Sequence, residues 1–124
     1  MKTKTERQAY EKAGRRAETL TVLWLRLKGY IILERRYKTR QGEIDIIAKK
    51  GVIIIMAEVK QRSDAKNLHE SVSYKNSQRI MDAAEIYLNR DQKFQPSDYE
   101  LRFDIIHVIG RWKISHIKDA FRAY

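Results

Sequence analysis

Three charged residues in the middle of the chain are of the types that carry out metal-dependent chemistry. Asp45 lies near the start of one expected strand, and Glu58 and Lys60 lie at the end of the next. Because side chains alternate along a strand, Glu43 shares a face with Asp45, and Glu58 shares a face with Lys60. Pairing of the two strands as a hairpin would bring two or three carboxylates and one ammonium group into a small volume.

Carboxylates so close together are costly, because like charges repel and each group loses water on burial. A divalent cation removes this cost, and Mg²⁺ takes carboxylates, waters and substrate phosphate as ligands. A lysine beside the ion could then orient or deprotonate the attacking water. For Asp45 alone, a solvent-facing charge is an equally good interpretation. For the set, the uninterrupted apolar run 52–57 favours a site, because a buried strand that becomes charged at its end aims polar groups into a cleft.

The composition limits the classes of protein to which the chain can belong. Its 124 residues are enough for one domain with a core, and the absence of cysteine excludes disulfides and thiolate-bound zinc. Most of the net charge of +10 lies in residues 1–62, which suits a polyanionic partner such as nucleic acid; the alternative is a basic protein with no such partner. With no apolar run of ~20 residues and no signal-like N-terminus, we expect a cytoplasmic protein that does not contact membranes.

The pattern of apolar residues predicts an α/β fold, with a mixed β-sheet flanked by helices in the order α-β-β-β-α-β-β. The polar segment 1–8 is expected to be a flexible N-terminus, and 9–124 to form a single domain. The expected helices span 8–28 and 74–89. The expected strands span 30–37, 43–49, 52–60, 99–109 and 112–117. Residues 61–73 are expected to form a loop with at most one helical turn.

The first expected helix carries one apolar stripe and one acidic residue beside it. The stripe has steps of three and four residues and consists of Ala13, Ala17, Leu20, Trp24 and Leu27. Glu18 lies on the neighbouring line, with Val22 and Leu25. Spacing alone favours a surface charge near Arg15 as the interpretation of Glu18. In the second helix, Lys75 and Arg79 share a side that either faces solvent or faces DNA, and periodicity does not distinguish the two.

Several short stretches of the sequence, taken in their order along the chain, resemble those of a known group of proteins. The element order, with Asp45 followed by Glu58-Val59-Lys60, resembles the PD-(D/E)XK nuclease superfamily, which has the restriction-endonuclease-like fold. More narrowly, the chain from Gly14 onward is similar to the YraN family of small bacterial proteins. The matching stretches are Gly14-Arg15-Arg16-Ala17-Glu18, Gly42-Glu43-Ile44-Asp45, Glu58-Val59-Lys60-Gln61-Arg62, Lys75 with Arg79, Arg102-Phe103-Asp104 and Asp119-Ala120-Phe121.

This resemblance implies a role for each matching residue. Asp45 and Glu58 would bind Mg²⁺, or Mn²⁺ in its place, with the backbone carbonyl of Val59 as a neighbouring ligand. Lys60 would assist the attacking water. Glu18 matches a metal-binding glutamate on the first helix of Holliday-junction resolvases, which overturns the surface interpretation. Glu43 would be an outer or alternative ligand. Nucleic acid is expected at the surrounding basic side chains, which are Arg15, Arg36, Lys38, Arg40, Arg62, Lys75 and Arg79.

The function that the resemblance implies is that of a magnesium-dependent endonuclease that hydrolyses phosphodiester bonds of DNA, including branched, Holliday-junction-like DNA. The alternative is a non-catalytic nucleic-acid-binding or adaptor protein that retains the fold, and an RNA substrate is a third interpretation. A homodimer is expected only by analogy with junction resolvases, which cut two strands. The chain departs from the superfamily motif in having Ile44 where the proline stands. It departs from the common family pattern at Arg36, where asparagine is usual, and at Met56, near which an aromatic residue is usual.

Overall fold

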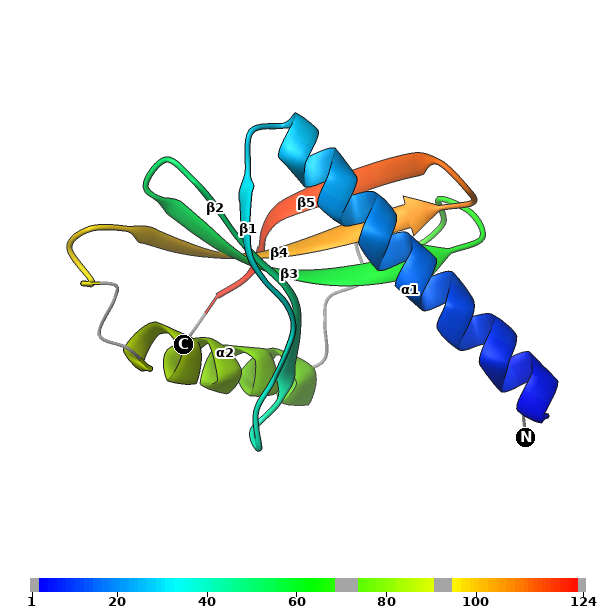
Figure 1. The fold of residues 1–124 in the computed structure, drawn as a ribbon, viewed down its shortest axis with the longest axis horizontal. Helices are drawn as coiled ribbons and strands as arrows, with labels where there is room; N and C mark the ends of the chain where they lie inside the picture. Colours follow the sequence, from blue (N-terminus) through cyan, green and yellow to red (C-terminus); the bar gives the residue numbers. More distant parts are fainter. Residues whose placement is uncertain (1–2, 69–73, 91–94, 123–124) are drawn as a thin grey trace.

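The structure is a computed structural model that describes residues 3–68, 74–90 and 95–122. The predicted α/β fold and its element order are confirmed (Figure 1). The elements are α1 (Lys4–Leu27), β1 (Ile31–Lys38), β2 (Glu43–Lys50), β3 (Ile53–Arg62), α2 (Tyr74–Asn89), β4 (Glu100–Ile109) and β5 (Lys113–Phe121). Within the described residues, neither helix is both long and apolar enough to cross a membrane. That 1–8 is flexible, that 9–124 is one domain and that the protein is cytoplasmic stay predictions.

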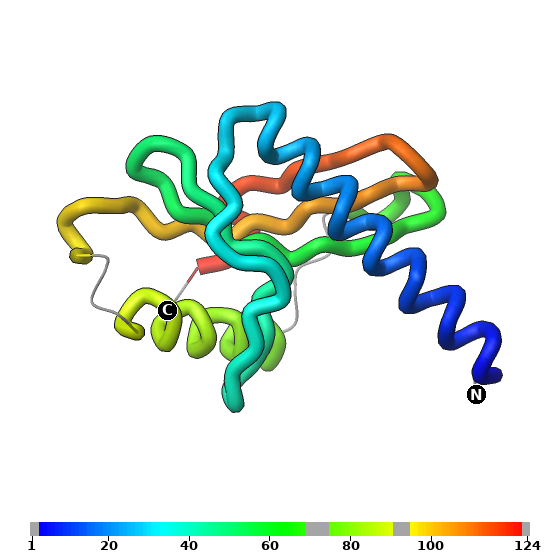
Figure 2. The backbone as a smooth tube through the Cα atoms, in the orientation of Figure 1, coloured from blue at the N-terminus to red at the C-terminus, as the bar shows by residue number. Residues whose placement is uncertain are grey.

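The five strands form one mixed sheet in the order β1-β2-β3-β4-β5. Neighbouring strands are antiparallel except β3 and β4, which are parallel and are joined through α2. A parallel pair needs such a crossover, whereas the antiparallel pairs need only short turns. The two helices pack on opposite faces of the sheet, as the backbone trace shows (Figure 2). A site at one end of the strands is therefore enclosed by α1 on one face and by α2 on the other.

The central strands β2 and β3 form the core, as their apolar sequence predicts. One set of their side chains packs towards α2, and it includes Ile44, Ile47, Ile54 and Met56. The other set packs towards α1, and it includes Ile46, Ala48, Ile55 and Ala57. All of these residues are buried. Burial on both faces makes this part of the sheet rigid, which fixes the charged residues that follow it.

Helix α1 begins earlier than periodicity predicts, at Lys4 rather than at residue 8. Thr3 and Glu6 form a capping box: each side chain accepts a hydrogen bond from the backbone N–H of the other. This arrangement satisfies N–H groups that have no partner inside the helix, so the polar first turn is helical without an apolar contact. At the other end, Gly29 adopts a φ of +94°, which a glycine accepts without strain, and the chain turns into β1.

The buried face of α1 also differs from the predicted stripe. The buried residues are Ala17, Glu18, Thr21, Val22 and Leu25. Leu27, which the stripe included, is 87% exposed, whereas Val22 and Leu25 on the neighbouring line are in the core. Two adjacent lines of α1 carry apolar residues, so the sequence does not decide between them. The choice of line matters, because Glu18 lies on the one that faces the sheet.

A buried ionic network centred on Asp104 joins β4 and β5 to Tyr30, the residue before β1. Arg102 donates two hydrogen bonds of 2.9 Å to the Asp104 carboxylate and one of 3.1 Å to the Tyr30 hydroxyl. His116 Nε2 lies 2.6 Å from Asp104 Oδ2, and the Asp119 backbone N–H donates to Oδ1. Burial alone would raise the pKa of Asp104, but these bonds together lower it below its ordinary value of 3.8.

This network explains why β5 runs to Phe121 instead of ending at residue 117, as predicted. The pairing of β4 and β5 shifts register between Phe103 and Ile105, and Asp119 adopts a φ of +56°. The hydrogen bond from Asp119 N–H to Asp104 carries β5 across this irregularity. His116 is structural, because its ring contacts the buried Asp104 carboxylate, and His107 is buried within β4.

Candidate active site

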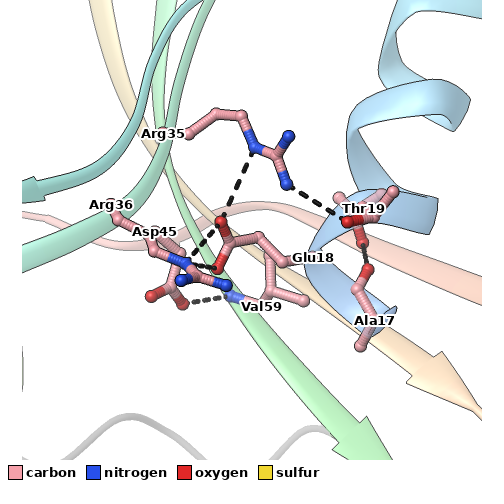
Figure 3. A network of polar contacts seen from close by, with 8 residues as sticks. Ala17, Glu18, Thr19, Arg35, Arg36, Asp45 and Val59 are labelled. Atoms are coloured by element: carbon pink, nitrogen blue, oxygen red, sulfur yellow. Dashed lines mark hydrogen bonds and ion pairs between the residues drawn. The ribbon is translucent and has the colours of Figure 1, made fainter. Parts of the chain in front are cut away.

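Asp45 lies where β2 separates from β3. The last pair of residues between these two strands is Ile46 with Ala57, so Asp45 lies just beyond it, next to Glu58. In place of a further backbone pair, Asp45 Oδ2 accepts a hydrogen bond of 2.8 Å from the Val59 backbone N–H (Figure 3). The carboxylate therefore fills the opening between the two strands, where both faces of the sheet can reach it.

The environment of Asp45 disfavours its charged form. Its pKa is raised from 3.8 to about 6, chiefly by burial, and then by repulsion from Glu58, Glu18 and Glu43, while the bond from Val59 opposes the shift. Three carboxylates therefore lie close enough to Asp45 to interact with it electrostatically. This is the crowding of acidic groups that the sequence predicts around residue 45.

Glu58 and Lys60 lie on the face of the sheet that α2 covers. Lys60 Nζ is 3.7 Å from Glu58 Oε1, whereas Glu58 Oε2 is buried and has no hydrogen-bond partner in the described part of the chain. A cleft of about 200 Å³, which we call the first cleft, opens beside them, and its walls come from β2, β3 and α2. Its lining residues are Gly42, Glu43, Ile44, Asp45, Ala57, Glu58, Asn76, Arg79 and Ile80.

The wall that α2 contributes depends on Gly42. A Cβ at this position would lie 2.6 Å from the Arg79 backbone carbonyl, so any other residue would push the turn before β2 away from the helix. The turn itself is closed by Thr39, whose hydroxyl accepts hydrogen bonds from the N–H groups of Gln41 and Gly42. Close contact between this turn and α2 places Arg79 at the edge of the first cleft.

Glu18 approaches Asp45 from the opposite face, on α1. It is 7% exposed, so the interpretation of Glu18 as a surface charge near Arg15 is wrong. Its partner is Arg36, whose Nε lies 3.2 Å from both carboxylate oxygens, and Arg35 Nε lies 3.7 Å from one of them (Figure 3). A further cleft of about 320 Å³, which we call the second cleft, lies beside Glu18 and Arg36. Its lining residues are Glu11, Gly14, Arg15, Glu18, Arg36, Lys38, Glu43, Asp45 and Val59.

An unusual backbone conformation directs both arginines to Glu18. Arg36 adopts a φ of +51° inside β1, a region that costs a residue other than glycine about 1–3 kcal/mol. In a regular strand, Arg35 and Arg36 would point to opposite faces, whereas here both reach the α1 side. The guanidinium of Arg36 therefore gives Glu18 a positive partner supplied by the chain itself.

The predicted acidic residues are thus brought to one region but not into one cleft. Asp45 and Glu43 line both clefts, Glu58 lines only the first, and Glu18 lines only the second. In the part of the chain that the structure describes, no three acidic or histidine side chains stand together in positions to hold a metal ion. Asp45 and Glu58 share the first cleft, and one Glu58 carboxylate oxygen has no hydrogen-bond partner among the residues that the structure describes.

Of the predicted nucleic-acid-binding residues, four line a cleft. Arg79 lines the first, and Arg15, Arg36 and Lys38 line the second. The others lie around them: Arg40 is exposed in the turn before β2, Lys75 is exposed in the first turn of α2, and Arg62 is half-buried at the end of β3.

Two polar residues that line the clefts, Glu11 and Asn76, were not among the predicted site residues. Helical spacing could have found both, because Glu11 is seven residues before Glu18 and Asn76 is three before Arg79.

The fold and site define a small α/β protein with acidic groups at an opening in its sheet and basic residues around them. A family model described as uncharacterised protein family UPF0102 matches residues 17–108. A UPF0102 protein of Agrobacterium fabrum is 41% identical over 116 residues, covering 94% of this chain and 93% of that protein. A UPF0102 protein of Bartonella tribocorum is 44% identical over 122 residues, covering 95% and 89%. The chain belongs to the UPF0102 family, which is the YraN family that its sequence resembles.

Proposed function

We propose that the protein hydrolyses phosphodiester bonds of DNA with the help of a divalent cation held by Asp45 and Glu58. The observation that carries the proposal is the buried Glu58 Oε2, which has no hydrogen-bond partner among the described residues and lies in the same cleft as Asp45, whose pKa is raised to about 6. Buried polar atoms are nearly always hydrogen-bonded, so an orphaned carboxylate oxygen points to a missing partner. A hard divalent ion such as Mg²⁺ or Mn²⁺ would satisfy both carboxylates at once.

The residues around this pair have separate tasks in such a reaction. The bound ion would polarise the scissile phosphate and lower the pKa of a coordinated water. Lys60, paired with Glu58 at 3.7 Å, carries an ammonium group that donates hydrogen bonds, so it would orient the attacking water. Arg79 at the edge of the same cleft would hold a phosphate oxygen. The Val59 carbonyl as an additional ligand and Glu43 as an outer ligand stay predictions.

Glu18 has a different place in this proposal from the one that the resemblance implies. Both of its oxygens contact Arg36, and it opens to the second cleft, so it can complete the ligand set only if Arg36 moves away. We expect the first ion to bind between Asp45 and Glu58, with Glu18 holding Arg36 beside the phosphate path. Branched DNA as the preferred substrate, and a homodimer as the active form, rest on the resemblance to junction resolvases alone.

The second candidate function is nucleic-acid binding without cleavage. The observation that favours it is the Glu18–Arg36 ion pair, in which the chain supplies the positive charge that a metal ion would otherwise supply. This function needs the same basic clefts and predicts no turnover with any metal ion.

One set of assays separates the two functions. Wild type, Asp45→Asn, Glu58→Gln and the double variant are incubated with plasmid, linear and four-way-junction DNA, and with RNA, in Mg²⁺, Mn²⁺ or EDTA. The matched control is Glu85→Gln, an identical change at an exposed residue of α2 that lines neither cleft.

We expect cleavage by wild type and by the control only with metal ion, with a loss of at least about 100-fold in the site variants. Binding to DNA should persist or strengthen in those variants, because a negative charge is removed. Cleavage by the double variant at the wild-type rate would refute the assignment. Binding without cleavage by any form would establish the second function.

A further inference from the structure

A groove on the outer side of α1 combines basic, apolar and aromatic side chains, and the proposed cleavage reaction does not use it. Its volume is about 470 Å³, and its walls come from α1 and the turn between β4 and β5. We call it the Trp112 groove, and its lining residues are Lys12, Arg15, Arg16, Thr19, Leu20, Leu23 and Trp112. Trp112 is 72% exposed and Leu23 is 52% exposed.

The indole of Trp112 is held in place although it is exposed. Arg16 donates a hydrogen bond of 2.8 Å to the Arg111 backbone carbonyl, which ties the turn to α1. The same guanidinium lies 5.4 Å from the centre of the Trp112 ring, at a distance typical of a cation–π contact. A fixed, exposed aromatic ring costs little further entropy when a ligand stacks on it. The turn therefore presents a preformed flat apolar surface.

The lining of the groove selects among ligands by charge. Among the residues that the structure describes, the lining contains three cationic side chains, Lys12, Arg15 and Arg16, and no acidic one. A purely apolar partner would leave these cations without counter-charges, which disfavours it. A paired duplex offers phosphates but keeps its bases stacked inside, so it cannot use the indole. An unpaired strand offers both, because each base has a face for stacking and each phosphate a charge for Lys or Arg.

The Trp112 groove is also continuous with the candidate active site. Arg15 lines both this groove and the second cleft, which contains Asp45. A strand that leaves Asp45 along the second cleft would therefore pass Arg15 and reach Trp112. A structure in which duplex DNA opens into an unpaired strand, such as a branch point or a flap, would fit this path.

We propose that the Trp112 groove binds an unpaired segment of nucleic acid, with one base stacked on the Trp112 indole and its phosphates on Lys12 and Arg15. The proposal rests on the proposed function in that nucleic acid is the ligand, and it does not require cleavage. It adds a substrate class: nucleic acid that contains a junction between paired and unpaired strands. The rival occupant is a second copy of the chain, covering Leu20, Leu23 and Trp112.

The test uses the tryptophans as reporters, because the chain has only two. In a Trp24→Phe variant, Trp112 is the sole tryptophan, and its fluorescence is followed while oligothymidine or a duplex of equal length is added. Affinity is measured in parallel from the anisotropy of the labelled oligonucleotide. The comparison variants are Trp112→Ala, Trp112→Phe and Lys12→Ala. The charge-matched control is Lys118→Ala, an exposed residue of β5 outside the groove.

We expect oligothymidine to quench Trp112 fluorescence, and Trp112→Ala to weaken oligothymidine binding roughly 5- to 150-fold, the range for loss of one base–aromatic stack. Trp112→Phe should retain part of the affinity, and duplex binding should change less than about twofold. Lys12→Ala should reduce the salt dependence of binding by about one phosphate contact, and Lys118→Ala should not.

Two outcomes would overturn the proposal. The first is oligothymidine binding by Trp112→Ala with wild-type affinity and no quenching of Trp112. The second is a dimer in sedimentation that Trp112→Ala converts to a monomer without loss of single-strand affinity, which would assign the groove to a second copy. Quenching is also measured in Asp45→Asn. If no form of the protein cleaves DNA but oligothymidine still quenches Trp112 in Asp45→Asn, the groove proposal holds and the nuclease proposal fails. If cleavage occurs without quenching, only the groove proposal fails.

Discussion

Replacing Asp45 by asparagine should make the metal-free protein more stable while it removes the proposed cation site. The substitution keeps the shape of the side chain and an oxygen that can accept the 2.8 Å hydrogen bond from Val59 N–H. What it removes is a negative charge that burial and three neighbouring carboxylates disfavour. Functional groups held at such a cost are the usual origin of a conflict between stability and activity.

The expected gain in stability follows from the pKa of Asp45 in the folded and in the unfolded chain. The pKa is 3.8 when unfolded and about 6 in the fold, which corresponds to about 3 kcal/mol of destabilisation at pH 7.5. Because the folded pKa is the higher one, the penalty is absent below pH 3.8, grows up to about pH 6 and is constant above it. The gain in stability from Asp45→Asn should therefore be close to zero below pH 4 and at most about 3 kcal/mol at pH 7.5. It is an upper limit because the new amide N–H group needs a hydrogen-bond partner of its own.

The assay is urea unfolding followed by circular dichroism at several pH values between 3.5 and 7.5, in EDTA, for both proteins. Asp98→Asn, at an exposed aspartate, is the control and should change stability by less than about 0.5 kcal/mol. Adding Mg²⁺ or Mn²⁺ at pH 7.5 should stabilise wild type but not Asp45→Asn, because ligands stabilise only the state that binds them. A variant no more stable than wild type at pH 7.5, or equally stabilised at pH 3.5 and 7.5, would refute the reasoning.

Two further predictions concern the acidic groups on either side of Asp45 and the network under β5. Glu58→Gln should weaken Mn²⁺ binding, measured by calorimetry, by at least about tenfold. Glu18→Gln should weaken it by less than about threefold, because Arg36 already neutralises Glu18. Equal losses of affinity in the two variants would contradict this ranking. Asp104→Ala should lower the free energy of unfolding by about 3–5 kcal/mol, because it leaves the Arg102 charge without its carboxylate. Urea unfolding measures this loss, Asp64→Ala at an exposed position is the control, and a loss below about 1 kcal/mol would show that the network is not what holds β5.

The main elements could be predicted because local signals and tertiary packing agree there. The periodicity of 74–89 coincides with α2, and the glycine of the Lys50-Gly51 pair adopts a φ of +60° in the turn between β2 and β3. Correct hairpin pairing then places Asp45 next to Glu58 without any further information. Where two signals compete, as on the two apolar lines of α1, the sequence does not decide. The true buried line is set by the sheet against which α1 packs.

The surroundings of Glu18 could not be predicted from the sequence for a different reason. Alternation in β1 assigns Arg35 and Arg36 to opposite faces, and only the positive φ of Arg36 turns both towards α1. A conformation of that kind has no sequence signal at an arginine, since residues that favour it are glycine and asparagine. The burial of Glu18 and its pairing with Arg36 therefore had to come from the structure.

The opening between β2 and β3 decides which acidic residues can act together. It exposes the Asp45 carboxylate to both faces of the sheet, but each face offers a different partner: Glu58 beside α2, and Glu18 beside α1. The Glu18 oxygens both contact Arg36, and one Glu58 oxygen has no partner within the described residues. A cation gains more from an unsatisfied carboxylate than from one it must first free from an ion pair. We therefore expect the α2 side to bind the ion and the α1 side, with Arg36, Arg15 and the Trp112 groove beyond it, to bind the strand.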